Sequence, residues 1–324
     1  MQYNNLYSKN NIFLLNNLKG LSILFIFAVH SAARCSVEAF YPLGMPIFAF
    51  ASGFAAKSND NRINIKYLCT LCSIYLLSNL LYSPFSLYLM YCQNEFNIPF
   101  LILGPNAGIL WYFIALIIWY FITPIFKATK HPLVLSILFC ALAYTLVQML
   151  PISRKAFQWG YIMNLIDMVF RFYPYYILGC LITWEKILDI RSFKYKYILI
   201  LPLLVIFALY GTSTLKYYPK SYVFLHEFLY FICAMYSLIT SLAIFPGMKL
   251  PFLSKVGVAS LNIYIFHFYI DLILNKIFVK TIGYSPIPIF LLFILIFSWF
   301  LASDRVSYLL SKGISATKKL IFSH

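Results

Sequence analysis

Two ionisable residues on one apolar stretch are the first candidates for chemistry. Lys19 and His30 stand eleven positions apart, at the two ends of a hydrophobic run. Eleven steps of 100° in an α-helix return to within about 20° of the starting direction, and the rise of 1.5 Å per residue separates the two positions by about 16 Å. A neutral imidazole can act as a general base. A histidine inside a membrane helix either hydrogen-bonds a neighbouring carbonyl or serves a function, and the cost of burying it favours function.

A second histidine has a similar placement near the other end of the sequence. His267 lies twelve positions after Lys255, which places it about 18 Å along a helix that would enter from the cytoplasm. We expect it at about the depth of His30, so that the two imidazoles could face a common cavity. Tyr264 precedes it by one turn on the same helix face and is either its partner or a packing residue.

The amino-acid composition indicates the environment in which these residues lie. Of 324 residues, 62% are apolar and 10% are charged, with a mean hydropathy of +0.83. A soluble domain carries about 25% charged residues. The sequence therefore predicts an all-α integral membrane protein that contacts membrane lipid.

The net charge of +16 does not indicate a nucleic-acid partner. The 25 Lys and Arg residues of the chain lie almost entirely between the apolar runs. At such positions basic residues serve as orientation signals and bind anionic lipid headgroups. Cys69 and Cys72 form a C-x-x-C on one predicted helix, but a zinc site would need a second such pair. We interpret them as buried apolar side chains and expect no metal site.

About ten spans are predicted, and most are long enough to cross a hydrocarbon core of ~30 Å. We expect a bundle of these helices in one domain covering residues 1–324, with the first run kept as a signal anchor. The predicted spans are 19–34, 39–57, 67–91, 108–127, 132–151, 161–184, 197–212, 222–245, 256–275 and 286–303.

The distribution of basic residues predicts the orientation. With both termini cytoplasmic, 17 of the 25 Lys and Arg residues fall inside, 7 fall outside, and Arg171 lies within a span. Cytoplasmic segments of membrane proteins carry the excess of such residues. We therefore expect both termini to be cytoplasmic.

Four sequence landmarks in order resemble the acyltransferase-3 family of membrane acyltransferases. Asn-Asn-Leu-Lys-Gly at 16–20 leads to His30, where the family favours Asp-x-Leu-Arg-Gly with the basic residue eleven positions before the histidine. The segment 44–54 is similar to the family's proline, phenylalanine and Ser-Gly-Phe run, 110–116 to its Leu-Trp-Phe segment, and 261–267 to its Tyr-x-x-His segment. The resemblance spans most of the chain.

Some positions depart from the family pattern. Asn16 replaces the family's acidic residue, and Lys19 replaces its usual arginine. On the cytoplasmic side of the third helix only Lys66 follows Arg62, and Thr70 stands where a further arginine would be sought. The resemblance leaves open a donor other than acetyl-coenzyme A.

The resemblance implies transfer of an acyl group, commonly acetyl, from cytoplasmic acyl-coenzyme A to a hydroxyl of a bacterial surface polysaccharide or lipid-linked sugar. It implies a multi-pass protein of the bacterial inner membrane, with acetyl-coenzyme A as donor substrate and no permanently bound cofactor. Lys19, Arg62 and Lys66 are candidates to bind the donor phosphates, although each loop cation is equally an orientation signal.

Within this chemistry, His30 is the expected base and a covalent acyl-histidine relay is the alternative. Candidate donors to the thioester oxyanion are Ser52, the backbone N–H of Gly53, Tyr264 and His267.

The remaining candidates concern the acceptor. Asp167 and Arg171 are four residues apart, so they either form an internal ion pair or line the acceptor path. Glu38 lies in a predicted outer link and is a candidate contact for the acceptor or an ordinary loop residue. Trp111 is a packing or belt residue, or a stacking platform for a sugar.

Two other classes of protein compete with an enzyme. A transporter of a small solute or glycan would use the same buried charges, but no internal repeat is visible in the sequence. A structural subunit of the envelope would have no use for buried ionisable residues. The sequence does not determine an oligomeric state.

Overall fold

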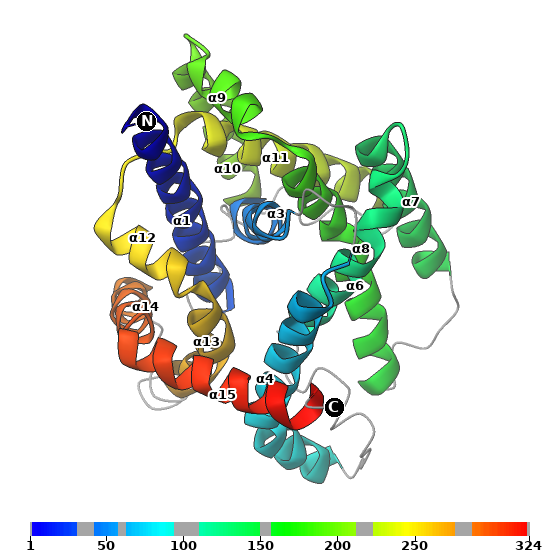
Figure 1. Ribbon diagram of the computed structural model, residues 1–324. Coiled ribbons are helices and arrows are strands. Elements are labelled where there is room, and N and C mark those ends of the chain that lie inside the picture. Colours follow the sequence, from blue (N-terminus) through cyan, green and yellow to red (C-terminus); the bar gives the residue numbers. More distant parts are fainter. Residues whose placement is uncertain are drawn as a thin grey trace. The chain divides into compact units, whose positions relative to one another are not determined.

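The computed structural model describes residues 2–30, 42–57, 63–93, 110–149, 157–211, 223–275 and 287–322, and these residues are helices and short connections with no strand (Figure 1). Long apolar runs are suited to lipid, where no water is present to hydrogen-bond the backbone. A helix pairs its backbone N–H and C=O groups within the segment itself. The all-α prediction is confirmed for this part of the chain.

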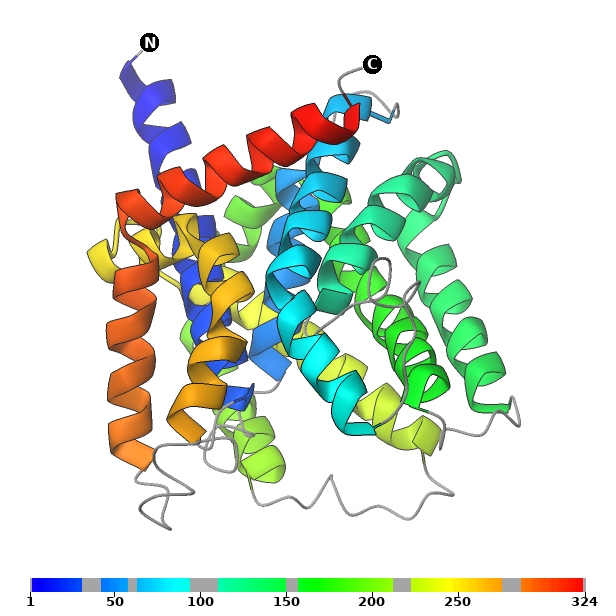
Figure 2. The same cartoon turned by 90° about the horizontal axis from the view of Figure 1, so that it is seen from below.

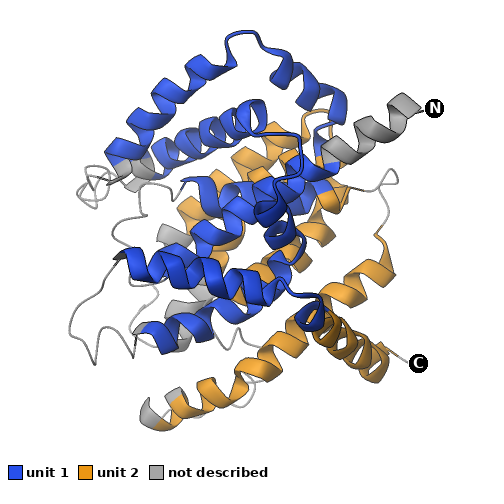
Figure 3. Cartoon of the chain, turned by 90° about the vertical axis from the view of Figure 1, so that its left-hand side faces the viewer, with its two compact units in different colours: residues 1–54, 181–307 blue, residues 55–180, 308–324 orange. Residues whose placement is uncertain are grey.

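The helices divide between two compact units, coloured separately in Figure 3. Unit 1 comprises residues 1–54 and 181–307, and unit 2 comprises residues 55–180 and 308–324. Unit 1 holds α1 (Gln2–His30), α3 (Gly44–Ala55), α9 (Trp184–Ser192), η3 (Lys196–Leu199), α10 (Ile200–Gly211), α11 (Val223–Ile244), α12 (Pro251–Val258), α13 (Ser260–Asn275) and α14 (Ile287–Leu301).

Unit 2 is built mainly from the middle of the chain. It holds α4 (Ile65–Gln93), α6 (Trp111–Lys127), α7 (Pro132–Met149), α8 (Phe157–Leu181) and most of α15 (Asp304–Phe322).

Three described segments are long and apolar enough to cross a membrane by length and composition: Ile12–His30, Ile65–Tyr88 and Glu227–Ile244. Three further helix pairs qualify as broken spans, with bends of 97° between α8 and α9, 85° between α12 and α13, and 61° between α14 and α15. Figure 2 shows the last bend, where α15 turns away from α14. The described helices thus support three spans, or up to six; ten spans remain a prediction.

Helix boundaries differ from the predicted spans at two functionally important places. The first helix begins at Gln2 rather than at residue 19, and its apolar window begins at Ile12. Lys19 therefore lies well inside the helix and not, as predicted, at the start of the apolar run. The predicted span 256–275 is divided by the 85° bend before Ser260. The depth of His267 can therefore not be counted along a straight helix from Lys255.

Two glycines allow α1 and α12 of unit 1 to cross in close contact. A Cβ atom on Gly20 would collide with the carbonyl oxygen of Leu253, and one on Gly257 would collide with the carbonyl oxygen of Asn16. Small residues permit this backbone approach, a common arrangement where membrane helices pack. The crossing fixes the middle of α1 against the segment that leads into α13.

A buried asparagine reinforces the same crossing. Asn17 donates from Nδ2 to the carbonyl oxygens of Pro246 (3.2 Å) and Met248 (2.8 Å), and its Oδ1 accepts from the N–H of Leu250 (3.4 Å). The side chain thereby satisfies backbone groups that have no helical partner just before α12. Asn262 on α13 similarly donates to the Leu301 carbonyl oxygen (3.0 Å) at the end of α14.

Polar contacts also join the helices of unit 2. The indole N–H of Trp119 on α6 donates to the carbonyl oxygen of Val169 on α8 (2.8 Å), and the hydroxyl of Tyr120 accepts from the N–H of Asn64 (2.8 Å). Each buried polar group of these aromatic residues therefore has a backbone partner, which fixes α6 between α8 and the start of α4.

Candidate functional site

Two histidines from opposite ends of the sequence meet in unit 1. His30 is the last residue of α1, and His267 lies in the middle of α13. Their ring centroids are 5.4 Å apart with an interplanar angle of 42°. The packing of α1 against α12 and α13 thus places in one location the two imidazoles that the sequence singled out.

The two rings differ in exposure. His267 is fully buried at 0% exposure, whereas His30 is exposed. The pair therefore extends from the interior of unit 1 to its surface.

A backbone contact fixes the tautomer of His267. Its Nδ1 lies 2.8 Å from the carbonyl oxygen of Tyr264, three residues earlier. A carbonyl oxygen only accepts hydrogen bonds, so Nδ1 must carry the proton and donate. In the neutral ring, Nε2 then keeps its lone pair.

The lone pair on Nε2 of His267 is available for chemistry. Nε2 is buried, and within the described part of the chain no hydrogen-bond partner reaches it. Buried polar atoms nearly always have a partner, and an exception calls for an explanation. A ring nitrogen that lies beside a second imidazole and makes no hydrogen bond to a described residue is suited to accept a hydrogen bond from a substrate.

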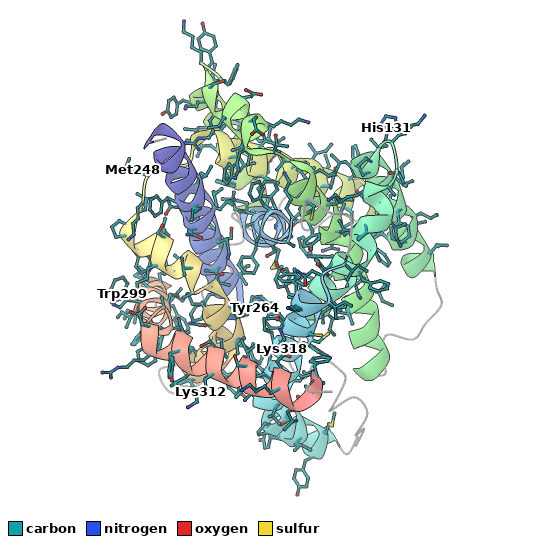
Figure 4. The ribbon with its side chains drawn as sticks, viewed as in Figure 1. His131, Met248, Tyr264, Trp299, Lys312 and Lys318 are labelled. Atoms are coloured by element: carbon teal, nitrogen blue, oxygen red, sulfur yellow. The ribbon has the colours of Figure 1, made fainter. Side chains whose placement is uncertain are left out.

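Aromatic side chains position the pair. Phe27, one turn before His30, meets the His267 ring edge-on at 5.7 Å, and Tyr264 lies 5.6 Å from the same ring. Phe48 on α3 stacks on Tyr264 at 6.0 Å. Figure 4 labels Tyr264 on α13. Three helices of unit 1, namely α1, α3 and α13, therefore contribute rings to one aromatic enclosure around the imidazoles.

The α3 residues predicted as oxyanion donors lie one turn beyond Phe48. Ser52 is half-buried and Gly53 is buried. Gly53 lies near the C-terminal end of α3, which begins at Gly44, so its backbone N–H is used in an intrahelical hydrogen bond to residue 49. As an oxyanion donor the Gly53 N–H would compete with this helical hydrogen bond; it and the Ser52 hydroxyl both stay predictions.

Lys19 shares α1 with His30 but lies farther from the pair. The two are joined by a continuous helix, so their separation stays about 16 Å. Lys19 is half-buried. It does not touch the imidazole pair, and a role toward the donor would be exerted at a distance from the reacting hydroxyl.

The remaining predicted site residues fall in unit 2 or outside the described residues. Lys66 is exposed on the first turn of α4, and Trp111 stacks on Phe172 at 5.6 Å. Nη2 of Arg171 lies 3.1 Å from Oδ2 of Asp167, so these two form the internal ion pair that was one of their two interpretations. Arg62 and Glu38 lie outside the described residues.

Asp271 is a residue that the sequence analysis missed. It is 3% exposed and lies one turn after His267 on the same face of α13. The spacing of Tyr264, His267 and Asp271 at positions i, i+3 and i+7 was visible in the sequence and indicated a common helix face. The aromatic neighbours Phe27 and Phe48 carried no comparable signal, because aromatic residues occur throughout the chain.

These features define a class: a multi-pass membrane protein with a buried and an exposed imidazole side by side within its helices. The model of the family described as "Acyltransferase domain", acyltransferase family 3, matches residues 13–303, which is most of the chain. The chain belongs to this family and is a membrane acyltransferase. The resemblance found in the sequence is confirmed. No curated protein and no solved structure matches the chain.

Proposed function

We propose that this acyltransferase moves an acetyl group from cytoplasmic acetyl-coenzyme A to a hydroxyl of a surface polysaccharide or lipid-linked sugar. It would act in the inner membrane of a bacterium, with about ten spans and both termini cytoplasmic. The observation that supports this chemistry is the pair of imidazoles, His30 and His267, 5.4 Å apart. The buried Nε2 of His267 makes no hydrogen bond to any described residue.

Acyl transfer to a hydroxyl needs a base, because a neutral hydroxyl is a weak nucleophile. In the proposed reaction His30, the exposed ring, removes the hydroxyl proton while the oxygen attacks the thioester carbonyl carbon. The resulting tetrahedral intermediate collapses with cleavage of the carbon–sulfur bond. The thiolate of coenzyme A leaves and takes up the proton from His30. General base catalysis of this kind contributes about 10²–10⁴-fold.

His267 has a supporting role in this mechanism. Its Nδ1–H is held by the Tyr264 carbonyl, so its Nε2 can only accept. We assign it to stabilising the protonated His30 ring, directly or through the substrate hydroxyl. The hydroxyls of Ser52 and Tyr264 are the candidates that would donate to the oxyanion.

The donor and acceptor ends of the reaction rest on other residues. We assign Lys19, Lys66 and Arg62 to the phosphates of the donor, since ammonium and guanidinium groups form strong charge-assisted hydrogen bonds with phosphate. Trp111 and Glu38 are assigned to the acceptor path, and the Asp167–Arg171 pair is assigned to stabilising α8.

A radiolabel transfer assay tests the proposal. Purified protein in proteoliposomes is mixed with acetyl-labelled coenzyme A and crude envelope glycan, and label in the glycan is counted. His30→Ala is expected to lower transfer at least about 100-fold. His131→Ala is the matched control, because His131 is an exposed histidine beside α7 in unit 2, and it should retain wild-type transfer (Figure 4).

The same preparations separate the competing class. Equal label transfer by wild type and His30→Ala would refute the assigned base. Accumulation of a solute in the proteoliposomes with no label in the glycan would instead identify a transporter.

A further inference from the structure

The last helix carries three distinct faces, and only one of them is used for packing. Helix α15 follows the apolar helix α14 after a bend of 61°. Its packed face includes Leu310, which is 7% exposed, and Gly313, where an added Cβ would lie 3.2 Å from Cδ2 of Leu77 on α4. Through this face α15 packs on α4 within unit 2, and the other two faces are exposed.

The second face is a row of cations. Arg305, Lys312 and Lys319 are spaced by seven residues, and each step of seven changes the direction by about 20°. All three are exposed, and Lys312 is labelled on α15 in Figure 4. The helix contains one acidic residue, Asp304, at its first position. Among the described residues, no carboxylate forms a salt bridge with any of the three cations.

The third face is apolar and lies next to the cationic row. Leu309 is 66% exposed and Leu320 is 84% exposed, with Ala316 between them on the same side of the helix. Scattered apolar residues are ordinary on a surface, but a line of them parallel to a line of cations is typical of a helix that lies in a membrane interface.

Polar contacts hold both ends of α15. Near its start, Asn262 Nδ2 donates to Oγ of Ser307 (2.8 Å) within unit 1. Toward its end, the Lys318 ammonium donates to Oγ1 of Thr70 (3.0 Å) and to the carbonyl oxygen of Lys66 (3.2 Å) within unit 2. Lys318 therefore binds α4, whereas no hydrogen bond or ion pair joins the three cations of the row to the described part of the chain.

We propose that α15 is a docking surface for anionic lipid headgroups, with Arg305, Lys312 and Lys319 contacting the headgroups and Leu309 and Leu320 inserted among the upper acyl segments. Charge complementarity identifies the occupant, because the row is cationic and the adjacent face is apolar. Long basic side chains bury their stems in the apolar layer and keep their charge at its boundary. This surface includes none of the residues assigned to the imidazole pair, and it does not depend on the proposed reaction.

Hydrogen exchange of full-length protein in lipid nanodiscs tests the proposal. The backbone amides of 308–322 are followed in discs of phosphatidylcholine and in discs containing phosphatidylglycerol. The anionic discs should slow exchange in this segment, and the effect should vanish at 1 M salt because the screening length falls to about 3 Å. R305Q/K312Q/K319Q should lower the protection about a hundredfold, since each basic residue at an anionic surface is worth about fivefold in binding.

A matched control removes three exposed lysines elsewhere. K130Q/K186Q/K249Q should leave the lipid-dependent protection of 308–322 unchanged. Exchange that is identical in both disc types for the wild type would overturn the proposal. Two other outcomes would also overturn it. Protection in phosphatidylcholine discs that arises only on adding coenzyme A would identify a soluble phosphate as the ligand. Protection that rises with protein density would identify a second copy of the chain.

Discussion

Two pairs of ionisable residues in this chain are built in opposite ways. Asp167 and Arg171 are four residues apart on α8, and their side chains meet at 3.1 Å. His30 and His267 come from α1 and α13, and their rings meet only because these helices pack together. The first pair follows from local helix geometry, while the second requires the tertiary fold of unit 1.

The two pairs also differ in the polar groups that remain available to a substrate. The charges of Asp167 and Arg171 largely compensate one another, as they must in a half-buried apolar setting. His267 hydrogen-bonds the backbone through Nδ1, whereas its Nε2 has no hydrogen-bond partner among the described residues. A locally assembled pair is thus suited to stability, and a pair assembled over long range can be suited to chemistry.

The sharpest test of this contrast removes the buried imidazole. His267→Leu should lower acyl transfer by about 10²-fold, because leucine has no atom that could accept a hydrogen bond from the protonated His30 ring. The double variant with His30→Ala should be no slower than His30→Ala alone, since residues that act as a unit have non-additive effects. The measurement is initial rates of label transfer at saturating donor.

Strict additivity of the two substitutions would mean that the rings act independently and that the pair is only a packing contact. The amount of folded protein, measured by size-exclusion chromatography in detergent, must be equal for all variants in this comparison. His131→Ala again serves as the reference histidine.

The second test addresses the crossing that brings α1 to the site. In Gly257→Ala the new Cβ would collide with backbone atoms of Asn16, which cannot rotate away, so the helices must separate. We expect a loss of about 3 kcal/mol in the free energy of unfolding, together with reduced transfer as His30 moves from His267. Equilibrium unfolding in mixed detergent–SDS micelles measures the first effect.

Gly313→Ala is the matched control in unit 2. Its Cβ would lie 3.2 Å from Cδ2 of Leu77, the end of a flexible side chain. Alanine also has a higher helix propensity than glycine, by about 1 kcal/mol. The control should therefore be neutral or stabilising. A neutral Gly257→Ala would show that the close crossing of α1 and α12 is not needed.

The sequence was most informative where structure depends on neighbours along the chain. The helical class, the Lys19–His30 spacing and the Asp167–Arg171 pair all follow from the helix repeat of 3.6 residues. The family resemblance named the chemistry. These predictions needed no knowledge of which helices touch.

Helix starts, bends and most partners of individual side chains could not be predicted in this way. The start of α1 at Gln2 was missed because the polar residues before Ile12 give no apolar signal, although they continue the helix. The bend before Ser260 was missed because the sequence on both sides of it is helical. The partners of Asn17 were missed because its three hydrogen bonds go to backbone groups in the segment 246–250, and every residue type has such groups.

The smallest expected effect concerns the local pair and completes the comparison. With side chains 15–19% exposed, Asp167 and Arg171 are less desolvated than a fully buried pair, so Asp167→Ala should cost about 2 kcal/mol in the free energy of unfolding rather than the ~3–5 kcal/mol of complete burial. The double variant D167A/R171A should cost less than D167A, because no single charge is left in an apolar setting. Unfolding in mixed micelles gives both values, and label transfer should follow the amount of folded protein. A transfer rate that falls far more than the folded fraction, in the double variant as well, would place this pair on the acceptor path and end its interpretation as a purely stabilising contact.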